Sequence, residues 1–240
     1  MKIIIIAGGL GTRISEETED KPKPMVLIND KPIIWHLMNI FSLQGFNEFI
    51  ISTGYKSEVI EKWVHGSEIL DSKLNPMKIA TLNTGLNTQT GGRIAEVMKT
   101  IPGERVIATY GDGLANISIP KLLEFHDSHR KLATITAVRP PARFGYMKIE
   151  KNVVTHFGEK NQSDEGWING GFFVLEPKVA NYVKSLDEPF ESGALVRLAN
   201  ESELIANHHE GFWQPMDTLR EKRDLEKEAK LIIPPWLKFN

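Results

Sequence analysis

The amino-acid sequence predicts an α/β fold in which helices cover a mostly parallel central sheet. Three observations lead to this class. Residues Ile3 to Ile6 form an unbroken β-branched run, as in strands that are buried on both faces. Segments with strand character then alternate with segments of helical periodicity as far as residue 138, which is typical of a parallel sheet. Glycine-rich turns follow two of the predicted strands, where α/β sheets bind their ligands.

The elements of the first half follow from local patterns. In residues 33–43 apolar side chains recur at helical spacing, and Gly45 follows where a helix would end. Ser57 stands where a helix cap is expected. Short β-branched runs that end in glycine or polar residues indicate buried strands. We expect strands at residues 3–6, 49–53, 77–82, 106–110 and 133–138, and helices at residues 33–43, 57–63, 94–100 and 119–129.

The second half begins with Pro140-Pro141, and from there the strand and helix patterns no longer alternate. Its short β-like runs indicate a smaller antiparallel part, and a charged stretch near the end indicates a last helix. The sequence contains no linker, low-complexity tract or internal repeat, so we expect one domain over residues 1–240, with halves at about 1–138 and 139–240. The expected elements are strands at 146–149, 153–157 and 171–175, helices at 177–186 and 217–230, and an exposed tail at Pro234-Pro235-Trp236.

Composition excludes several classes of protein. The chain has 240 residues, no cysteine and a formal net charge of −2. Disulfides and thiolate metal sites are therefore impossible, and no overall positive field would draw the protein to nucleic acid or to a membrane surface. No apolar run approaches the ~20 residues that span a bilayer, and no signal-peptide pattern is present. We expect a soluble cytoplasmic protein with no nucleic-acid or membrane partner.

The strongest motif directly follows the first strand and reads Ala7-Gly8-Gly9-Leu10-Gly11-Thr12-Arg13, with Lys23 ten residues later. A strand that ends in a glycine-rich turn with basic side chains is typical of phosphate binding. The spacing fits neither the P-loop nor the dinucleotide G-x-G-x-x-G pattern. The alternative is a tight turn with solvated basic residues.

Two aspartates are candidate metal ligands. Asp112 lies between two glycines after the strand 106–110, and Asp217 precedes the last predicted helix. Alone, Asp112 could form an Asx turn and Asp217 could be a helix N-cap. Beside a phosphate loop, two carboxylates that converge on phosphate oxygens would suit Mg²⁺.

Two further segments are candidates for ligand contacts. Glycines before a helix in Thr88-Gln89-Thr90-Gly91-Gly92-Arg93 could let the backbone read a base edge, or could be an ordinary helix entry. Glu159 could accept hydrogen bonds from sugar hydroxyls and Lys160 could bind a phosphate, near Asn169 and Gly170, although a surface Glu-Lys pair is commonplace. His126 and His129, at i and i+3 on a helix, fit no zinc pattern and are interpreted as structural.

Taken together, these motifs resemble the glucose-1-phosphate cytidylyltransferases, a branch of the sugar-phosphate nucleotidyltransferases. The segments that carry the resemblance are Ala7 to Arg13 with Lys21 to Met25, Thr90 to Arg93, Tyr110 to Gly113, Ile168 to Leu175 and Gly211 to Arg220. The resemblance implies a Rossmann-like fold and transfer of a cytidylyl group from CTP to glucose 1-phosphate, with Mg²⁺ as the cofactor and pyrophosphate as the second product. It also implies a homo-oligomer and a place in sugar-nucleotide and polysaccharide biosynthesis.

The resemblance also implies roles for individual residues. Nucleotide binding is expected at Ala7, Gly8, Gly9, Leu10, Gly11, Thr12, Arg13, Lys23, Thr88, Gly92, Arg93 and Gly111. Substrate binding is expected at Glu159, Lys160, Asn169 and Gly170. Asp112 and Asp217 are the expected metal ligands. The residues expected to carry catalysis are Arg13, Lys23 and Asp112.

Three departures from the family bear on the acceptor and on assembly. Asn161 stands where the family usually has proline, and Gly193-Ala194 follows Glu191 where the family tends to have Glu-Pro. The segment between Tyr55 and Thr84 is shorter than in the family. A different phosphorylated acceptor, or a nucleotide-sugar-binding relative without turnover, therefore stand as alternatives.

Overall fold

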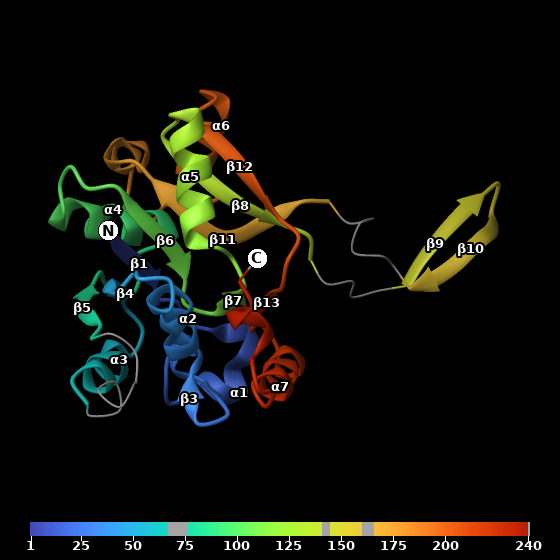
Figure 1. Ribbon diagram of the computed structural model, residues 1–240, viewed down its shortest axis with the longest axis horizontal. Helices are drawn as coiled ribbons and strands as arrows, with labels where there is room; N and C mark the ends of the chain where they lie inside the picture. Colours follow the sequence, from blue (N-terminus) through green and yellow to red (C-terminus); the bar gives the residue numbers. More distant parts are fainter. Residues whose placement is uncertain (67–75, 141–144, 160–165, 240) are drawn as a thin grey trace.

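The computed structural model describes residues 1–66, 76–140, 145–159 and 166–239 (Figure 1). Within these residues, seven strands form one sheet in the order β12-β8-β11-β6-β1-β4-β5. Every neighbouring pair is parallel except the two pairs made by β11, which runs antiparallel to β6 and to β8. The predicted α/β class with a mostly parallel sheet is confirmed.

The strands of the sheet come from both halves of the chain. They are β1 (Lys2–Ile6), β4 (Glu48–Thr53), β5 (Lys78–Asn83), β6 (Val106–Tyr110), β8 (Ala133–Val138), β11 (Ile168–Leu175) and β12 (Leu204–His209). Ile6 at the end of β1 lies opposite Ser52 of β4 and Tyr110 of β6. The carboxyl ends of these three strands therefore meet at one edge, and the loops that follow them share one space.

Helices cover both faces of the sheet, which is why β1 is apolar from Ile3 to Ile6. Ile3 and Ile5 pack into one core and Ile4 and Ile6 into the other, and all four are buried. On the Ile3 face lie α2 (Ile33–Ser42), α3 (Ser57–Val64), α5 (Ile119–His129) and α7 (Leu219–Glu228). On the Ile4 face lie α4 (Thr90–Thr100), α6 (Ala194–Asn200) and a 3-10 helix at Pro177–Tyr182.

Short elements complete the described chain. The small α1 (Ser15–Thr18) follows the opening loop, and three two-stranded ribbons join β2 (Leu27–Ile28) to β3 (Lys31–Pro32), β7 (Gly113–Ala115) to β13 (Trp213–Pro215), and β9 (Gly145–Glu150) to β10 (Val153–Glu159). The β9–β10 hairpin stands apart from the central sheet in Figure 1. No helix among the described residues is long and apolar enough to cross a membrane.

Two expectations for the second half are wrong. The helix expected at 177–186 is a 3-10 helix that ends at Tyr182, whose carbonyl accepts a hydrogen bond from the Arg197 guanidinium at 2.9 Å instead of continuing a helical ladder. The tail expected to be exposed is anchored, because Trp236 is fully buried against His36 and Phe212. Burial of a large aromatic side chain outweighs the ordering of a short tail.

Candidate active site

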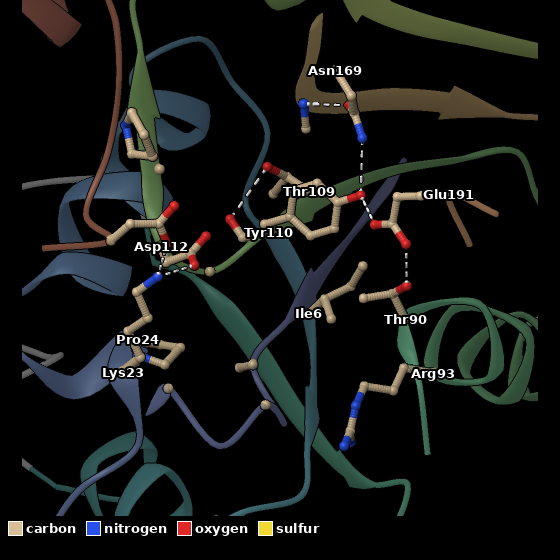
Figure 2. A pocket seen from close by; sticks show the side chains of 18 of the residues that line it. Ile6, Lys23, Pro24, Thr90, Arg93, Thr109, Tyr110, Asp112, Asn169 and Glu191 are labelled. Carbon is tan, nitrogen blue, oxygen red and sulfur yellow. Dashed lines mark hydrogen bonds and ion pairs between the residues drawn. The ribbon is translucent and has the colours of Figure 1, made fainter. Parts of the chain in front are cut away.

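A large cavity lies at the carboxyl ends of β1 and β6. Its volume is about 1060 Å³, and loops from both halves of the chain line it. The walls comprise the loop after β1, the segment before α4, the turn after β6 and the beginning of β11 (Figure 2). This is where open α/β sheets bind ligands, and the volume suits a molecule the size of a nucleotide.

Arg93 fixes the position of the loop after β1 through hydrogen bonds of its guanidinium. Its side chain is buried, and its guanidinium donates hydrogen bonds to the carbonyl of Gly8 at 2.9 Å, the carbonyl of Thr53 at 2.8 Å and the hydroxyl of Thr84 at 2.7 Å. A Cβ atom at Gly8 would lie 2.0 Å from Nη1 of Arg93, so only glycine allows this approach. Burial lowers the pKa of Arg93. The guanidinium of Arg93 therefore connects the segment Thr88 to Arg93 with the glycine-rich loop after β1.

Lys23 lies between the two predicted metal ligands. Its ammonium nitrogen is 2.7 Å from Oδ2 of Asp112 and 2.6 Å from Oδ1 of Asp217, and the lysine side chain is only 9% exposed. Arg13 Nη1 is 2.5 Å from the other oxygen of Asp217. Burial lowers the pKa of Lys23, but the charges and hydrogen bonds of the two aspartates outweigh it, so the pKa is raised overall. Four charges of a predicted phosphate site thus form one cluster.

The side chain of Asp217 can join this cluster because Thr218, and not Asp217, is the N-cap residue of α7. The hydroxyl of Thr218 accepts from the backbone N–H of Glu221, and the Glu221 carboxylate accepts from the N–H of Thr218, which completes a capping box at α7. The N–H of Asp217 also donates to Glu221 at 2.7 Å. Asp217 is therefore held at the cavity by its backbone, and its carboxylate is left to face Lys23 and Arg13.

A second polar network lies at the opposite side of the cavity from Lys23 (Figure 2). The Tyr110 hydroxyl donates to one oxygen of Glu191, and Thr90 donates to the other at 2.7 Å. Asn169 Nδ2 donates to the Tyr110 oxygen at 3.1 Å. Burial and the Glu191 charge raise the pKa of Tyr110, so its proton stays on the hydroxyl. The sequence analysis assigned no role to Tyr110, although it begins the motif Tyr110 to Gly113, and none to Glu191, which no local motif marks as a ligand-binding residue.

Comparisons with known proteins agree with this geometry. The model of the nucleotidyl transferase family matches residues 2–214, most of the chain. The chain belongs to this family. The glucose-1-phosphate cytidylyltransferase of Salmonella typhi is 43% identical over 98% of both chains, and the probable glucose-1-phosphate cytidylyltransferase of Bacillus subtilis is 42% identical over 95% of both. The crystal structure of HddC from Yersinia pseudotuberculosis complexed with GMP-PN has a TM-score of 0.71 at 27% identity, over 95% of this chain and 99% of that one.

In this nucleotidyltransferase, most predicted site residues lie around one cavity. Its lining includes Ala7, Gly9, Leu10, Gly11, Thr12, Arg13, Lys23, Thr88, Arg93, Gly111, Asp112, Asn169, Gly170 and Asp217. Gly92 faces elsewhere, because a Cβ atom there would lie 2.3 Å from the Leu186 carbonyl; its glycine serves the packing of α4 rather than a ligand contact. Gly8 is turned towards Arg93.

The remaining substrate-binding predictions concern the hairpin. Glu159 is the last residue of β10 and pairs with Gly145 of β9, and the structure describes its backbone only. Lys160 lies outside the described residues. Their contacts with the acceptor stay predictions.

The cluster around Lys23 has the right chemistry for a hard divalent cation. Asp112 and Asp217 both approach a single ammonium nitrogen, so their carboxylates lie close enough to share one ion. No set of three or more metal-ligating side chains occurs within the described ranges. A cation here would need further oxygen ligands from phosphates or water, which is how Mg²⁺ is commonly bound.

Proposed function

We propose that this enzyme transfers a cytidylyl group from CTP to a sugar 1-phosphate, with glucose 1-phosphate as the expected acceptor and Mg²⁺ as the cofactor. The observation that carries the proposal is the convergence of Arg13, Lys23, Asp112 and Asp217 at a cavity of nucleotide size. The identity of 43% to the Salmonella typhi enzyme supports CTP and glucose 1-phosphate as the substrates.

The reaction is an in-line displacement at the α-phosphorus of CTP. A phosphate oxygen of the acceptor forms the new bond to this phosphorus, and the bond to the β-phosphate oxygen breaks, so that pyrophosphate leaves with the electron pair. The acceptor oxygen is already anionic at neutral pH, so no general base is needed. Alignment and charge neutralisation supply the catalysis.

The charged cluster fits these needs. Arg13 and Lys23 would neutralise the charge that grows on the leaving pyrophosphate, while backbone N–H groups of the loop after β1 would hold phosphate oxygens. Asp112 and Asp217 would hold Mg²⁺, which supplies charge stabilisation to the phosphates when bound. The Arg93 guanidinium would act through the Gly8 carbonyl by fixing the loop.

The proposal extends to the acceptor and to the assembly of the enzyme. Asn161 and Gly193-Ala194 depart from the family pattern in the half expected to meet the sugar. We propose a single catalytic domain over residues 1–240, because β11 and β12 of the second half belong to the same sheet as β1. We also propose that the enzyme is a cytoplasmic homo-oligomer. Within each site, Thr88 and Gly111 would contact the cytidine nucleotide.

Pyrophosphate release tests the proposal directly. The purified protein is incubated with Mg²⁺, one of the four ribonucleoside triphosphates and one acceptor from a panel of hexose 1-phosphates and other phosphorylated metabolites. We expect release with CTP and glucose 1-phosphate above all other pairs. Release with CTP and only a non-sugar phosphate would point to another acceptor. CTP binding without release for any acceptor would point to a relative without turnover.

A further inference from the structure

We propose that Glu191, together with Asn169, reads hydroxyl groups of the acceptor sugar and is a specificity-determining residue of this site. The inference rests on the proposed function and adds a recognition role that no motif of the sequence indicates. It begins from the position of Glu191, which lines the cavity and is exposed to it.

The carboxylate of Glu191 is held by two segments that lie far from it in the sequence. Its Oε2 accepts from Thr90 at the beginning of α4, and its Oε1 accepts from Tyr110 at the end of β6 (Figure 2). Thr90 in turn accepts from the N–H of Phe190 at 2.8 Å, so the single hydroxyl hydrogen of Thr90 must point to Glu191. The carboxylate is therefore fixed in place before any ligand arrives.

The directions of these hydrogen bonds leave acceptor sites on Glu191 and a donor on Asn169. The Asn169 carbonyl oxygen accepts from the N–H of Gly171 at 2.8 Å, which fixes the orientation of the amide. One Nδ2 hydrogen then goes to Tyr110. An ionised carboxylate has about four lone-pair positions, of which Thr90 and Tyr110 use two. An acceptor and a donor side by side match a hydroxyl group, which both donates and accepts.

Charge indicates which part of a ligand lies here. In the described part of the chain, Glu191 is bonded by neutral hydroxyls and by no lysine or arginine. Among the basic residues of the cavity, Lys23 and Arg13 are gathered around Asp112 and Asp217, and Arg93 is turned towards Gly8, Thr53 and Thr84. An unneutralised carboxylate repels phosphate, which leaves the neutral parts of the substrates, and the donor of the adjoining Asn169 completes the pair of contacts that a hydroxyl group needs. Asn169 belongs to the half of the chain in which the resemblance implies contacts with the sugar phosphate, which favours the acceptor sugar over the ribose.

The first experiment compares Glu191→Ala with the matched exposed control Glu210→Gln, using pyrophosphate release with CTP and glucose 1-phosphate. We expect the KM for the sugar phosphate to rise about 10-fold or more in Glu191→Ala, as for the loss of a hydrogen bond to a charged group, while the KM for CTP changes less than about 2-fold. Tyr110→Phe keeps the carboxylate and should have a smaller effect. Equal KM values for the sugar phosphate in Glu191→Ala and the wild type would overturn the proposal.

Deoxy substrates distinguish direct contact from a structural role. A glucose 1-phosphate analogue that lacks the hydroxyl read by Glu191 should be a poor substrate of the wild type, yet should lose no further efficiency in Glu191→Ala. If this non-additivity occurs with 2′-deoxy-CTP instead, Glu191 reads the ribose and the proposal is wrong. If losses simply add for every analogue, Glu191 makes no direct contact and the proposal is equally wrong.

A binding measurement separates this inference from the proposed function. Should the wild type release no pyrophosphate with any sugar 1-phosphate, the proposed function fails. Calorimetry then measures the affinities of the protein for CDP-glucose and for CDP, and their difference tests the contact between Glu191 and the sugar. Tighter binding of CDP-glucose that is lost in Glu191→Ala upholds the hydroxyl contact, and equal binding of both ligands by the wild type overturns it.

Discussion

The ammonium nitrogen of Lys23 lies 2.6 Å from Oδ1 of Asp217, although 194 positions of sequence separate the two residues. This ion pair joins the segment after the opening loop to the beginning of α7. Asp112 contacts the same nitrogen from the end of β6, so one lysine organises three distant parts of the chain.

Substitution of Lys23 by methionine should lower stability and abolish transfer. The two aspartates would face each other without a cation between them, and we expect a loss of about 1–3 kcal/mol in the free energy of unfolding, less than for a fully buried pair because both carboxylates are partly exposed. Thermal unfolding with and without Mg²⁺ tests this: the ion should raise the melting temperature of Lys23→Met more than that of the wild type. Equal shifts would argue against a metal site between Asp112 and Asp217.

Substitution of Asp112 by asparagine should stop turnover and leave the fold intact. The change removes one negative charge from the proposed metal site, and we expect a loss of about 100-fold or more in kcat, since metal binding to phosphates contributes several kcal/mol. Asp217 would still pair with Lys23, so the melting temperature should change little. Asp224→Asn, at an exposed position of α7, is the control. Full turnover in Asp112→Asn would remove Asp112 from the metal site.

Arg93→Lys should loosen the opening loop. Lysine cannot reach the oxygens of Gly8, Thr53 and Thr84 together, so at least one of these oxygens would lose its donor. We expect a loss of about 2–4 kcal/mol in the free energy of unfolding, together with a higher KM for CTP. Chemical denaturation and steady-state kinetics measure the two effects.

The exposed Arg223→Lys is the matched control for that experiment. Gly8→Ala offers a second check, because its methyl group would push against the same guanidinium. The double variant should lose less stability than the sum of the two single variants. Strict additivity would contradict the assigned contact between Gly8 and Arg93.

The fold, and the residues that form the charged cluster around Lys23, could be predicted from the sequence because their signals are local. Ile3 to Ile6 indicate a strand buried on both faces, and glycines beside Arg13 and Asp112 mark the ends of strands. Gly92 shows the limit of such reasoning: a glycine beside a predicted ligand-binding segment turns out to serve the packing of α4 against the Leu186 carbonyl.

The features that the sequence does not reveal depend on distant partners. Strand β12 reads Leu-Ile-Ala-Asn-His-His, and as an edge strand it lacks the apolar run of a central one. Trp236 follows two prolines, which is typical of a loose tail, and only the aromatic cluster with His36 and Phe212 makes it core. Glu191 acquires its place through Thr90 and Tyr110, which are 101 and 81 positions away.

His126 and His129 form a hydrogen-bonded chain whose proton positions follow from its ends. The N–H of Lys131 donates to Nδ1 of His129, so the His129 proton is on Nε2 and points to the hydroxyl of Thr134. Thr134 then donates to Nδ1 of His126, and Nε2 of His126 donates to Glu176. Each step requires a neutral imidazole, and the interpretation of both histidines as structural agrees with this network.

This chain should make the fold sensitive to acid below about pH 6.5. Burial lowers the pKa of His126, although Glu176 opposes the shift, and burial together with neighbouring His126 and Lys131 lowers the pKa of His129. The unfolded chain, with histidine pKa values near 6.5, therefore binds more protons than the folded one below that pH. The stabilisation is complete above about pH 6.5 and is lost as the pH falls, by up to about 1.4 kcal/mol per pH unit for the buried His126.

Urea denaturation at pH 7.5, 6.5, 5.5 and 5.0 measures this dependence. The double variant His126→Gln, His129→Gln should be less stable at pH 7.5, because Thr134 and Glu176 lose their hydrogen bonds to the imidazoles, but its stability should change less across the series. Carboxylates titrate mainly below this range, and the Arg105 guanidinium that also binds Glu176 keeps its charge throughout. A wild-type stability that is constant from pH 7.5 to 5.0, or a double variant with the same decline, would show that protonation of these two histidines does not oppose folding.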